Sequence, residues 1–281
     1  MTPFLVFSDT EGTIYSHPHL RMAGESWDRV CVPQPQELRP LSQGSTLFMM
    51  PGRAPVGYDP DTGGYVTLTE FEGRPVWAVA AFLMPSYLRL YTPACTVGGH
   101  GTLPLWAYAA AGYYGGRFYA AGIRVDSRNR QLPHFYLDCE NLRKRVAQRI
   151  KQRPRNRLYR HFARCALEYN CLNAKNLFYG RWEAPLVVSN ICNARCLGCL
   201  SLQKQNDCEA SHERIDFTPS PEEVAEVACD HLTTAREPIV SFGQGCEGEP
   251  LLKAEVIEAA LRLIRSRTGR GTIHLNTTGS L

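Results

Sequence analysis

The composition is that of a globular protein rather than a membrane, fibrous or disordered one. The chain has 281 residues, of which 44% are hydrophobic, enough for one large or two medium-sized domains. Its longest apolar stretch, residues 103–114, is interrupted by a proline and a glycine and is too short to cross a bilayer, so we expect no membrane partner. Eleven cysteines without a secretory signal predict a reducing, cytoplasmic location, where thiols bind metals or pack in cores.

The net charge of +4 originates in one segment. Ten of the 31 Lys and Arg residues lie between Arg143 and Arg164, and no acid lies among them. One interpretation is a phosphate-binding surface, which would make the chain a non-catalytic nucleic-acid-binding module. The other is a pair of helix faces that are solvated or paired with acids elsewhere in the fold. The second is favoured because the nearby aromatic residues, Tyr159 and Phe162, form no stacking series.

Residues 1–125 are predicted to form a β-rich domain with a few helices, whose role the sequence does not identify. Short apolar runs separated by turn signals indicate its strands. These strands are expected at residues 4–7, 65–69, 76–80 and 117–119, with turns at Glu11-Gly12, Gly63-Gly64 and Gly98-Gly99. Three conspicuous histidines, His17, His19 and His100, are too widely spread to suggest a metal site, so we expect surface or core positions for them.

Residues 126–183 are predicted to be a basic helical connector. One helix should run from Asp138 or Glu140 to about residue 152, and a second from an Asn156 cap to about residue 169, with a proline between them. Isolated cysteines in and before this segment are expected to pack in cores, because free cysteine behaves as a small hydrophobe. They include Cys95, Cys139, Cys165 and Cys171. A second cluster held by Cys165 and Cys171 is the alternative.

From residue 184 onward, strand, loop and helix alternate. Strands are expected at residues 186–188, 239–242 and 272–275. Ser220 with Pro221 and Glu223 marks the start of a helix that should reach about residue 232, and a second helix should end near Arg267. Such alternation predicts a parallel sheet with right-handed crossovers, whose functional loops lie at the carboxyl ends of the strands.

The loop after the first of these strands contains Cys192, Cys196 and Cys199. Thiolates this close in sequence can reach one metal centre, and three of them leave one coordination position open, which usually indicates reactivity. A structural zinc site, with Cys208 or His212 as the fourth ligand, is the principal alternative. The spacing also fits one face of a helix, but Gly198 and the preceding strand disfavour a continuous helix.

A glycine-rich loop, Gly243–Gly248, follows the second strand and also fits a dinucleotide-binding fingerprint. That fingerprint expects an acid at the end of the next strand, where this chain has Asn276-Thr-Thr-Gly279. The match to a dinucleotide site is therefore weak.

Taken together, the three loops resemble those of the radical SAM superfamily. Its members carry a CxxxCxxC loop after the first strand of a parallel α/β barrel, as this chain does at 192–199. They carry a Gly-Gly-Glu-Pro-like turn after the second strand, matched by Glu247–Pro250, and many have a Thr-Asn-Gly-like turn after the third, matched by Asn276–Gly279. The chain departs from the family at Gly198, where an aromatic residue is common, and at Glu247, which replaces the first glycine.

The resemblance implies a [4Fe–4S] cluster on the three thiolates, with S-adenosyl-L-methionine chelating the fourth iron. Backbone carbonyls of the 247–250 turn, helped by Glu249, would accept hydrogen bonds from the methionine ammonium. Reductive cleavage would give a 5'-deoxyadenosyl radical that abstracts hydrogen from a substrate. The implied metal ligands are Cys192, Cys196 and Cys199, and the implied cofactor-binding residues are Glu247, Gly248, Glu249, Pro250, Asn276 and Thr278. The resemblance does not identify a catalytic residue.

The expected fold class is α/β: a β-rich (α+β) domain, the helical connector, and residues 184–281 as the first half of a partial TIM barrel. Because that barrel needs about six strands, we expect a fragment, or a chain whose missing half is supplied by a partner, with cluster binding retained and turnover lost. Other expected partners are an electron donor such as reduced ferredoxin or flavodoxin, and a substrate that is a peptide or protein, a tRNA or a small metabolite.

Overall fold

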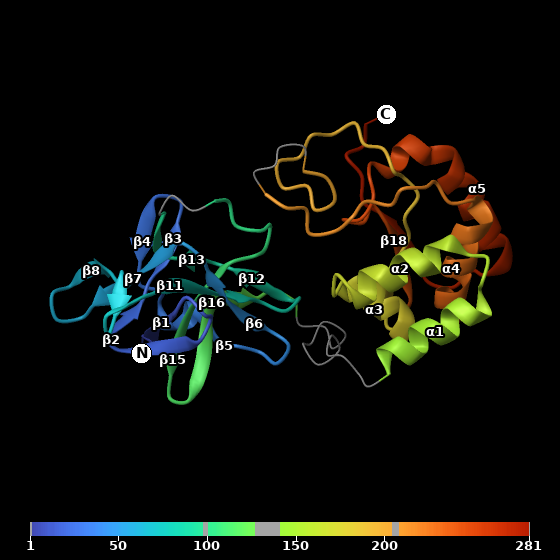
Figure 1. Ribbon diagram of the computed structural model, residues 1–281. Helices are drawn as coiled ribbons and strands as arrows, with labels where there is room; N and C mark the ends of the chain where they lie inside the picture. The colour runs from blue at the N-terminus through green and yellow to red at the C-terminus, as the bar shows by residue number, and fades with distance from the viewer. Residues whose placement is uncertain (1, 98–100, 127–140, 204–207, 281) are drawn as a thin grey trace. The chain divides into compact units, whose positions relative to one another are not determined.

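The computed structural model describes residues 2–97, 101–126, 141–203 and 208–280. Contacts divide the chain into two compact units, Met1–Leu137 and Asp138–Leu281, which are described separately (Figure 1). Gly98, Gly99, His100 and Cys139, which figured in the sequence analysis, lie outside the described residues. None of the helices described has the length and apolar character that crossing a bilayer requires.

The first unit is built on an eleven-stranded antiparallel sheet. Its main path runs β12-β16-β15-β11-β1-β2-β7-β14, and β5, β6 and β8 pair with β16, β11 and β7 respectively. The strands are β1 (Phe4–Ser8), β2 (Ile14–Met22), β5 (Leu38–Pro40), β6 (Thr46–Met50), β7 (Arg53–Asp59), β8 (Gly64–Thr67), β11 (Trp77–Phe82), β12 (Tyr87–Arg89), β14 (Cys95–Val97), β15 (Ala109–Tyr114) and β16 (Arg117–Arg124). Two small sheets comprise β3 (Gly24–Ser26), β4 (Arg29–Cys31) and β13 (Thr92–Pro93), and β9 (Glu70–Phe71) and β10 (Arg74–Pro75).

This unit is β-rich, as predicted, and its four predicted strands are present as β1, β8, β11 and β16. The prediction of a few helices in this unit is wrong for the described residues, in which the only helix is a short 3₁₀ helix at Pro35–Glu37. Hairpins join β1 to β2, β7 to β8 and β15 to β16, whereas the other neighbours in this sheet come from segments farther apart in the sequence. His19 lies at the surface of this unit, where its Nε2 atom is 3.0 Å from the Asp59 carboxylate.

The second unit begins with α1 (Leu142–Gln152), α2 (Arg157–Leu167) and α3 (Leu172–Tyr179). The first two confirm that helices form in the basic segment; the predicted start of the first, Asp138 or Glu140, lies outside the described residues. The Asn156 side chain caps α2 by accepting a hydrogen bond from the Leu158 amide at 3.0 Å. These helices share one hydrophobic core with the elements after residue 183, so the structure groups the predicted connector with the C-terminal part.

A three-stranded parallel sheet lies at the centre of this unit, in the order β17-β18-β19. Its elements are β17 (Glu183–Pro185), α4 (Pro221–Thr234), β18 (Ile239–Phe242), η4 (Pro250–Lys253), α5 (Ala254–Arg267) and β19 (Thr272–Leu275). Helix α4 starts at the predicted capping box, in which Ser220 and Glu223 exchange side-chain to backbone hydrogen bonds. The predicted strands 239–242 and 272–275 are confirmed, whereas the first strand lies three residues upstream of 186–188.

The predicted fold class is wrong. The largest sheet is antiparallel, the described residues contain five α-helices, and no parallel β/α barrel is found among them. Strands β17 and β19 each pair with β18 and not with one another, so this parallel sheet is open. Alternation of strands and helices specifies parallel pairing and crossovers, but neither strand number nor closure.

Four arginines of the basic segment are paired with acids. Asp230 of α4 contacts Arg149 at 3.1 Å and Arg153 at 2.7 Å, and Glu223 contacts Arg157 at 2.6 Å. Arg164 pairs with Glu213 and, at 3.0 Å, with Glu168. These ion pairs agree with the interpretation that the basic helix faces are paired with acids elsewhere in the fold. Nucleic-acid binding by the segment stays a prediction.

Candidate metal and cofactor site at one edge of the parallel sheet

Three loops meet where the strands of the parallel sheet end. Because β17, β18 and β19 run in the same direction, their carboxyl ends share one edge. The cysteine loop follows β17, the 243–250 turn follows β18, and the 276–279 turn follows β19. The structure thus brings together the three segments in which the sequence placed its metal-binding and cofactor-binding residues.

The Glu247 carboxylate joins the first two loops. One of its oxygens accepts hydrogen bonds from the Val188 and Ser189 amides at 2.8 and 3.1 Å, and the other from the Gly243 and Gln244 amides at 2.6 and 3.1 Å. Burial raises the pKa of Glu247 above its ordinary value, although the hydrogen bonds from the four amides act in the opposite direction. This interaction also explains the shifted strand: the Val188 and Ser189 amides bind a carboxylate instead of continuing the ladder of β17.

Gly248 brings the backbones of these two loops into direct contact. Its amide donates to the Ser189 carbonyl at 2.7 Å, and the next amide, that of Glu249, donates to the Ile191 carbonyl at 2.9 Å. A Cβ atom at position 248 would lie 1.8 Å from the Ile191 carbonyl oxygen, so only glycine fits. Gly243 is equally restricted, because a Cβ there would lie 1.9 Å from the Asn276 carbonyl oxygen.

The Glu249 carboxylate joins the 247–250 turn to the 276–279 turn. It accepts hydrogen bonds from the Thr277 hydroxyl and from the Thr278 amide at 2.9 Å, and it caps η4 through the Leu251 amide at 3.1 Å. Burial alone raises the pKa of Glu249, but these hydrogen bonds hold it below its ordinary value. Because the carboxylate is engaged within the protein, its geometry indicates a positioning role rather than direct contact with a methionine ammonium.

The cysteine loop has no helix between residues 190 and 200, which excludes the helical-stripe alternative. Cys196 is exposed, Cys192 and Cys199 are partly buried, and all three are free thiols. Asn193 holds the loop to the 276–279 turn through hydrogen bonds from its side-chain amide to Ser280 at 3.3 Å. The three cysteines therefore lie on a loop anchored at both neighbouring turns.

The surroundings of Cys199 favour a thiolate. The Arg214 guanidinium donates to its Sγ atom at 3.5 Å, and the Ser201 hydroxyl lies 3.9 Å from the same atom. Partial burial raises the pKa of Cys199, but hydrogen bonds from Ser201 and Leu202 and the charge of Arg214 bring it below its ordinary value. Thiolate is the form that ligates a metal, so this environment fits a ligand.

The sulfur atoms of the loop do not form a compact single-ion site. Among the described residues, the groups of three or more donor atoms that lie within 4.8 Å of one another include none of Cys192, Cys196, Cys199 and Cys208. A zinc ion would need such a group, whereas a four-iron cluster binds each thiolate through a different iron and accepts wider spacing. His212, the other candidate for a fourth zinc ligand, lines a cavity with Cys165 instead.

The remaining predicted cofactor-binding residues, Asn276, Thr278 and Pro250, differ in exposure. Asn276 and Thr278 are exposed; the Asn276 side chain donates to the Phe242 carbonyl at 3.3 Å, and the Thr278 hydroxyl lies 3.0 Å from that of Ser280. Pro250 is buried as the first residue of η4. Comparison with protein-family models, with curated proteins and with solved structures finds no match to this chain.

Sequence reasoning missed two features of this site. Glu247 was predicted as a cofactor-binding residue of the turn and noted as a departure from a glycine, but the role of its carboxylate was missed, because its four amide partners are recognisable only once the strands are paired. Arg214 lies 15 residues beyond Cys199, across a segment with no regular pattern, so no spacing signal connects them. Its charge next to a cysteine becomes visible only in the folded chain.

Proposed function

We propose that this chain binds a [4Fe–4S] cluster through Cys192, Cys196 and Cys199, with S-adenosyl-L-methionine at the fourth iron, and acts as a radical enzyme. The observation that carries the proposal is the meeting of the three loops at one sheet edge, joined by the Glu247 and Glu249 carboxylates. A thiolate-stabilising environment at Cys199 and a donor set of three free thiols on one loop fit such a cluster.

The chain's own residues have distinct tasks in this proposal. Cys199, held by Arg214 and Ser201, presents a thiolate, and the exposed Cys196 gives a reduced ferredoxin or flavodoxin access to the site. The Glu247 carbonyl accepts from Ser201 and the Glu249 carbonyl from Leu252. Among the hydrogen bonds of the described residues, none engages the Gly248 carbonyl, so this carbonyl is the one that would accept from the methionine ammonium. When bound and reduced, the cluster would supply the electron that cleaves the sulfonium and starts hydrogen abstraction from a substrate.

Cluster loading tests the proposal. After anaerobic reconstitution, the chain should hold about four irons and four sulfides, because each thiolate anchors one iron. The variants Cys192→Ala, Cys196→Ala and Cys199→Ala should each lose most of that iron. Cys229→Ala removes a partly buried free thiol of α4 and is the matched control, which should load like the unaltered chain. Equal iron in the loop variants and in this control would contradict the proposal.

A further inference from the structure

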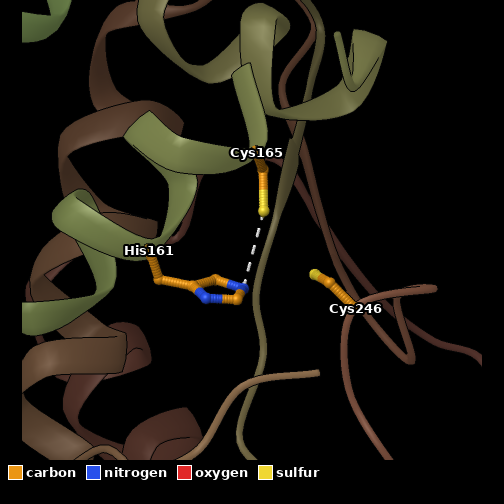
Figure 2. A group of neighbouring side chains, drawn as sticks. All are labelled: His161, Cys165 and Cys246. Atoms are coloured by element: carbon orange, nitrogen blue, oxygen red, sulfur yellow. Dashed lines mark hydrogen bonds between the residues drawn. The ribbon is translucent and has the colours of Figure 1, made fainter. Parts of the chain in front are cut away.

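A second group of metal-binding atoms lies beneath the 243–250 turn, within the same unit. His161 and Cys165 come from α2, and Cys246 comes from the turn (Figure 2). One nitrogen and two sulfur atoms of these side chains all lie within 4.8 Å of one another. Cys165 is 1% exposed and Cys246 is 6% exposed, so both thiols are buried, whereas His161 is partly exposed.

The fold explains why these residues meet. His161 and Cys165 are four residues apart, so they lie on the same face of α2, one turn apart. Cys246 is held opposite them because its carbonyl accepts from the Ile215 amide at 2.8 Å and its neighbour Glu247 is fixed by four amides. Figure 2 shows the two side chains of α2 and the sulfur of Cys246 directed into one common space.

The distances suit a tetrahedral ion. Typical zinc bonds to sulfur and nitrogen place those two ligand atoms about 3.6 Å apart in a tetrahedral site. The Cys165 Sγ and His161 Nε2 atoms are 3.7 Å apart.

His212 is the candidate for a fourth ligand; its ring lies outside the group of atoms within 4.8 Å of one another and would have to move toward that group. A cavity of about 120 Å³ is lined by Cys165, Cys246, Cys171 and His212. The Nδ1 atom of His212 is buried and has no hydrogen-bond partner among the described residues. Buried polar atoms are normally satisfied, so an unpaired imidazole nitrogen beside two thiols and a second imidazole indicates an absent partner.

We propose that His161, Cys165 and Cys246 bind a structural Zn²⁺ ion, with His212 as the fourth ligand. Two thiolates and two imidazoles form a common closed zinc site and select this borderline-soft ion over Mg²⁺ or Ca²⁺. The ion would connect α2 to the 243–250 turn at Cys246, the residue next to Glu247. It is distinct from the iron cluster, shares no ligand with it, and would stabilise the turn from its buried side.

Cobalt substitution tests the site separately from the cluster. In the full chain carrying Cys192→Ala, Cys196→Ala and Cys199→Ala, one equivalent of Co²⁺ should produce thiolate charge-transfer and tetrahedral d–d bands, which Zn²⁺ abolishes. Adding Cys246→Ala should remove these bands, and adding Cys229→Ala should leave them unchanged. Failure of the triple variant to bind Co²⁺, or bands that survive Cys246→Ala, would overturn the zinc proposal and leave the cluster proposal unaffected.

A measurement on the unaltered chain removes any dependence on variant folding. Iodoacetamide labelling followed by peptide mass spectrometry should show Cys165 and Cys246 protected by Zn²⁺ and labelled after chelation. Cys229 reports general accessibility and should label equally in both conditions. Equal labelling of Cys165 and Cys246 with and without Zn²⁺, or recovery of the two as a disulfide-linked peptide from the zinc-loaded chain, would overturn the proposal.

Discussion

At the scale of single residues, the site depends on one glycine and two glutamates that hold three loops together. The Glu247 carboxylate accepts hydrogen bonds from amides of two loops, and the Glu249 carboxylate accepts from one amide and one hydroxyl of the third. The three cysteines were recognisable from spacing alone, because they lie within eight residues of one another. The role of Glu247 was not, because two of its partners, Val188 and Ser189, are 59 and 58 residues distant in sequence.

Gly248→Ala should destabilise the second unit by about 3 kcal/mol, because the added Cβ meets the Ile191 carbonyl and the backbone must shift. Urea unfolding followed by circular dichroism measures the change. Gly198→Ala is the matched control in the cysteine loop, since a Cβ there meets nothing within 4 Å, and it should change the free energy of unfolding by less than about 0.5 kcal/mol. Equal stability of the two variants would refute the close contact at Gly248.

At the scale of elements, four of the five helices described were predicted, two of them from local start signals and two, α1 and α5, without a side-chain cap. Asn156 and Ser220 mark α2 and α4, and both caps are present in the structure. Helix α3 starts at Leu172, after an N-cap residue, Cys171, whose side chain makes no capping hydrogen bond, and this helix was missed. The first parallel strand was misplaced because its neighbouring amides bind Glu247, a tertiary interaction that local patterning does not contain.

Asp230 joins elements far apart in sequence, since α1, α2 and α4 meet at its carboxylate. Burial raises the pKa of Asp230, but hydrogen bonds from Arg153 and Tyr159 and the charges of Arg153 and Arg149 lower it overall. A lowered folded-state pKa means that its stabilisation is complete above the unfolded value of about 3.9 and is lost as the pH falls through the folded value.

Asp230→Asn should therefore cost about 2 kcal/mol at pH 7, because it removes charge-assisted hydrogen bonds, and the difference from the unaltered chain should shrink below pH 4. Urea unfolding across pH 3–7 measures both effects. Glu258→Gln breaks an exposed pair with Arg262, whose side chains are 66% and 78% exposed, and should cost less than about 0.5 kcal/mol. A cost for Asp230→Asn that does not vary with pH would contradict the ionic role.

At the scale of the whole molecule, the sequence predicted local alternation correctly and global architecture wrongly. The first unit is ordered by pairings between distant segments, such as Phe4 with Tyr113, that turn signals do not specify. In the second unit, the β/α alternation predicted parallel pairing and the loops at one edge, but not how many strands pair or whether they close. The candidate site was more predictable than the fold because its residues lie in loops that follow three short strands.

The central claim is that three thiolates hold a cluster with one open iron. Its most direct test is the electron paramagnetic resonance spectrum of the reduced, reconstituted chain with and without S-adenosyl-L-methionine. We expect a [4Fe–4S]⁺ signal that changes when S-adenosyl-L-methionine chelates the open iron, and no such signal in Cys196→Ala. A spectrum identical with and without S-adenosyl-L-methionine, or a [4Fe–4S]⁺ signal that persists in Cys196→Ala, would contradict the account.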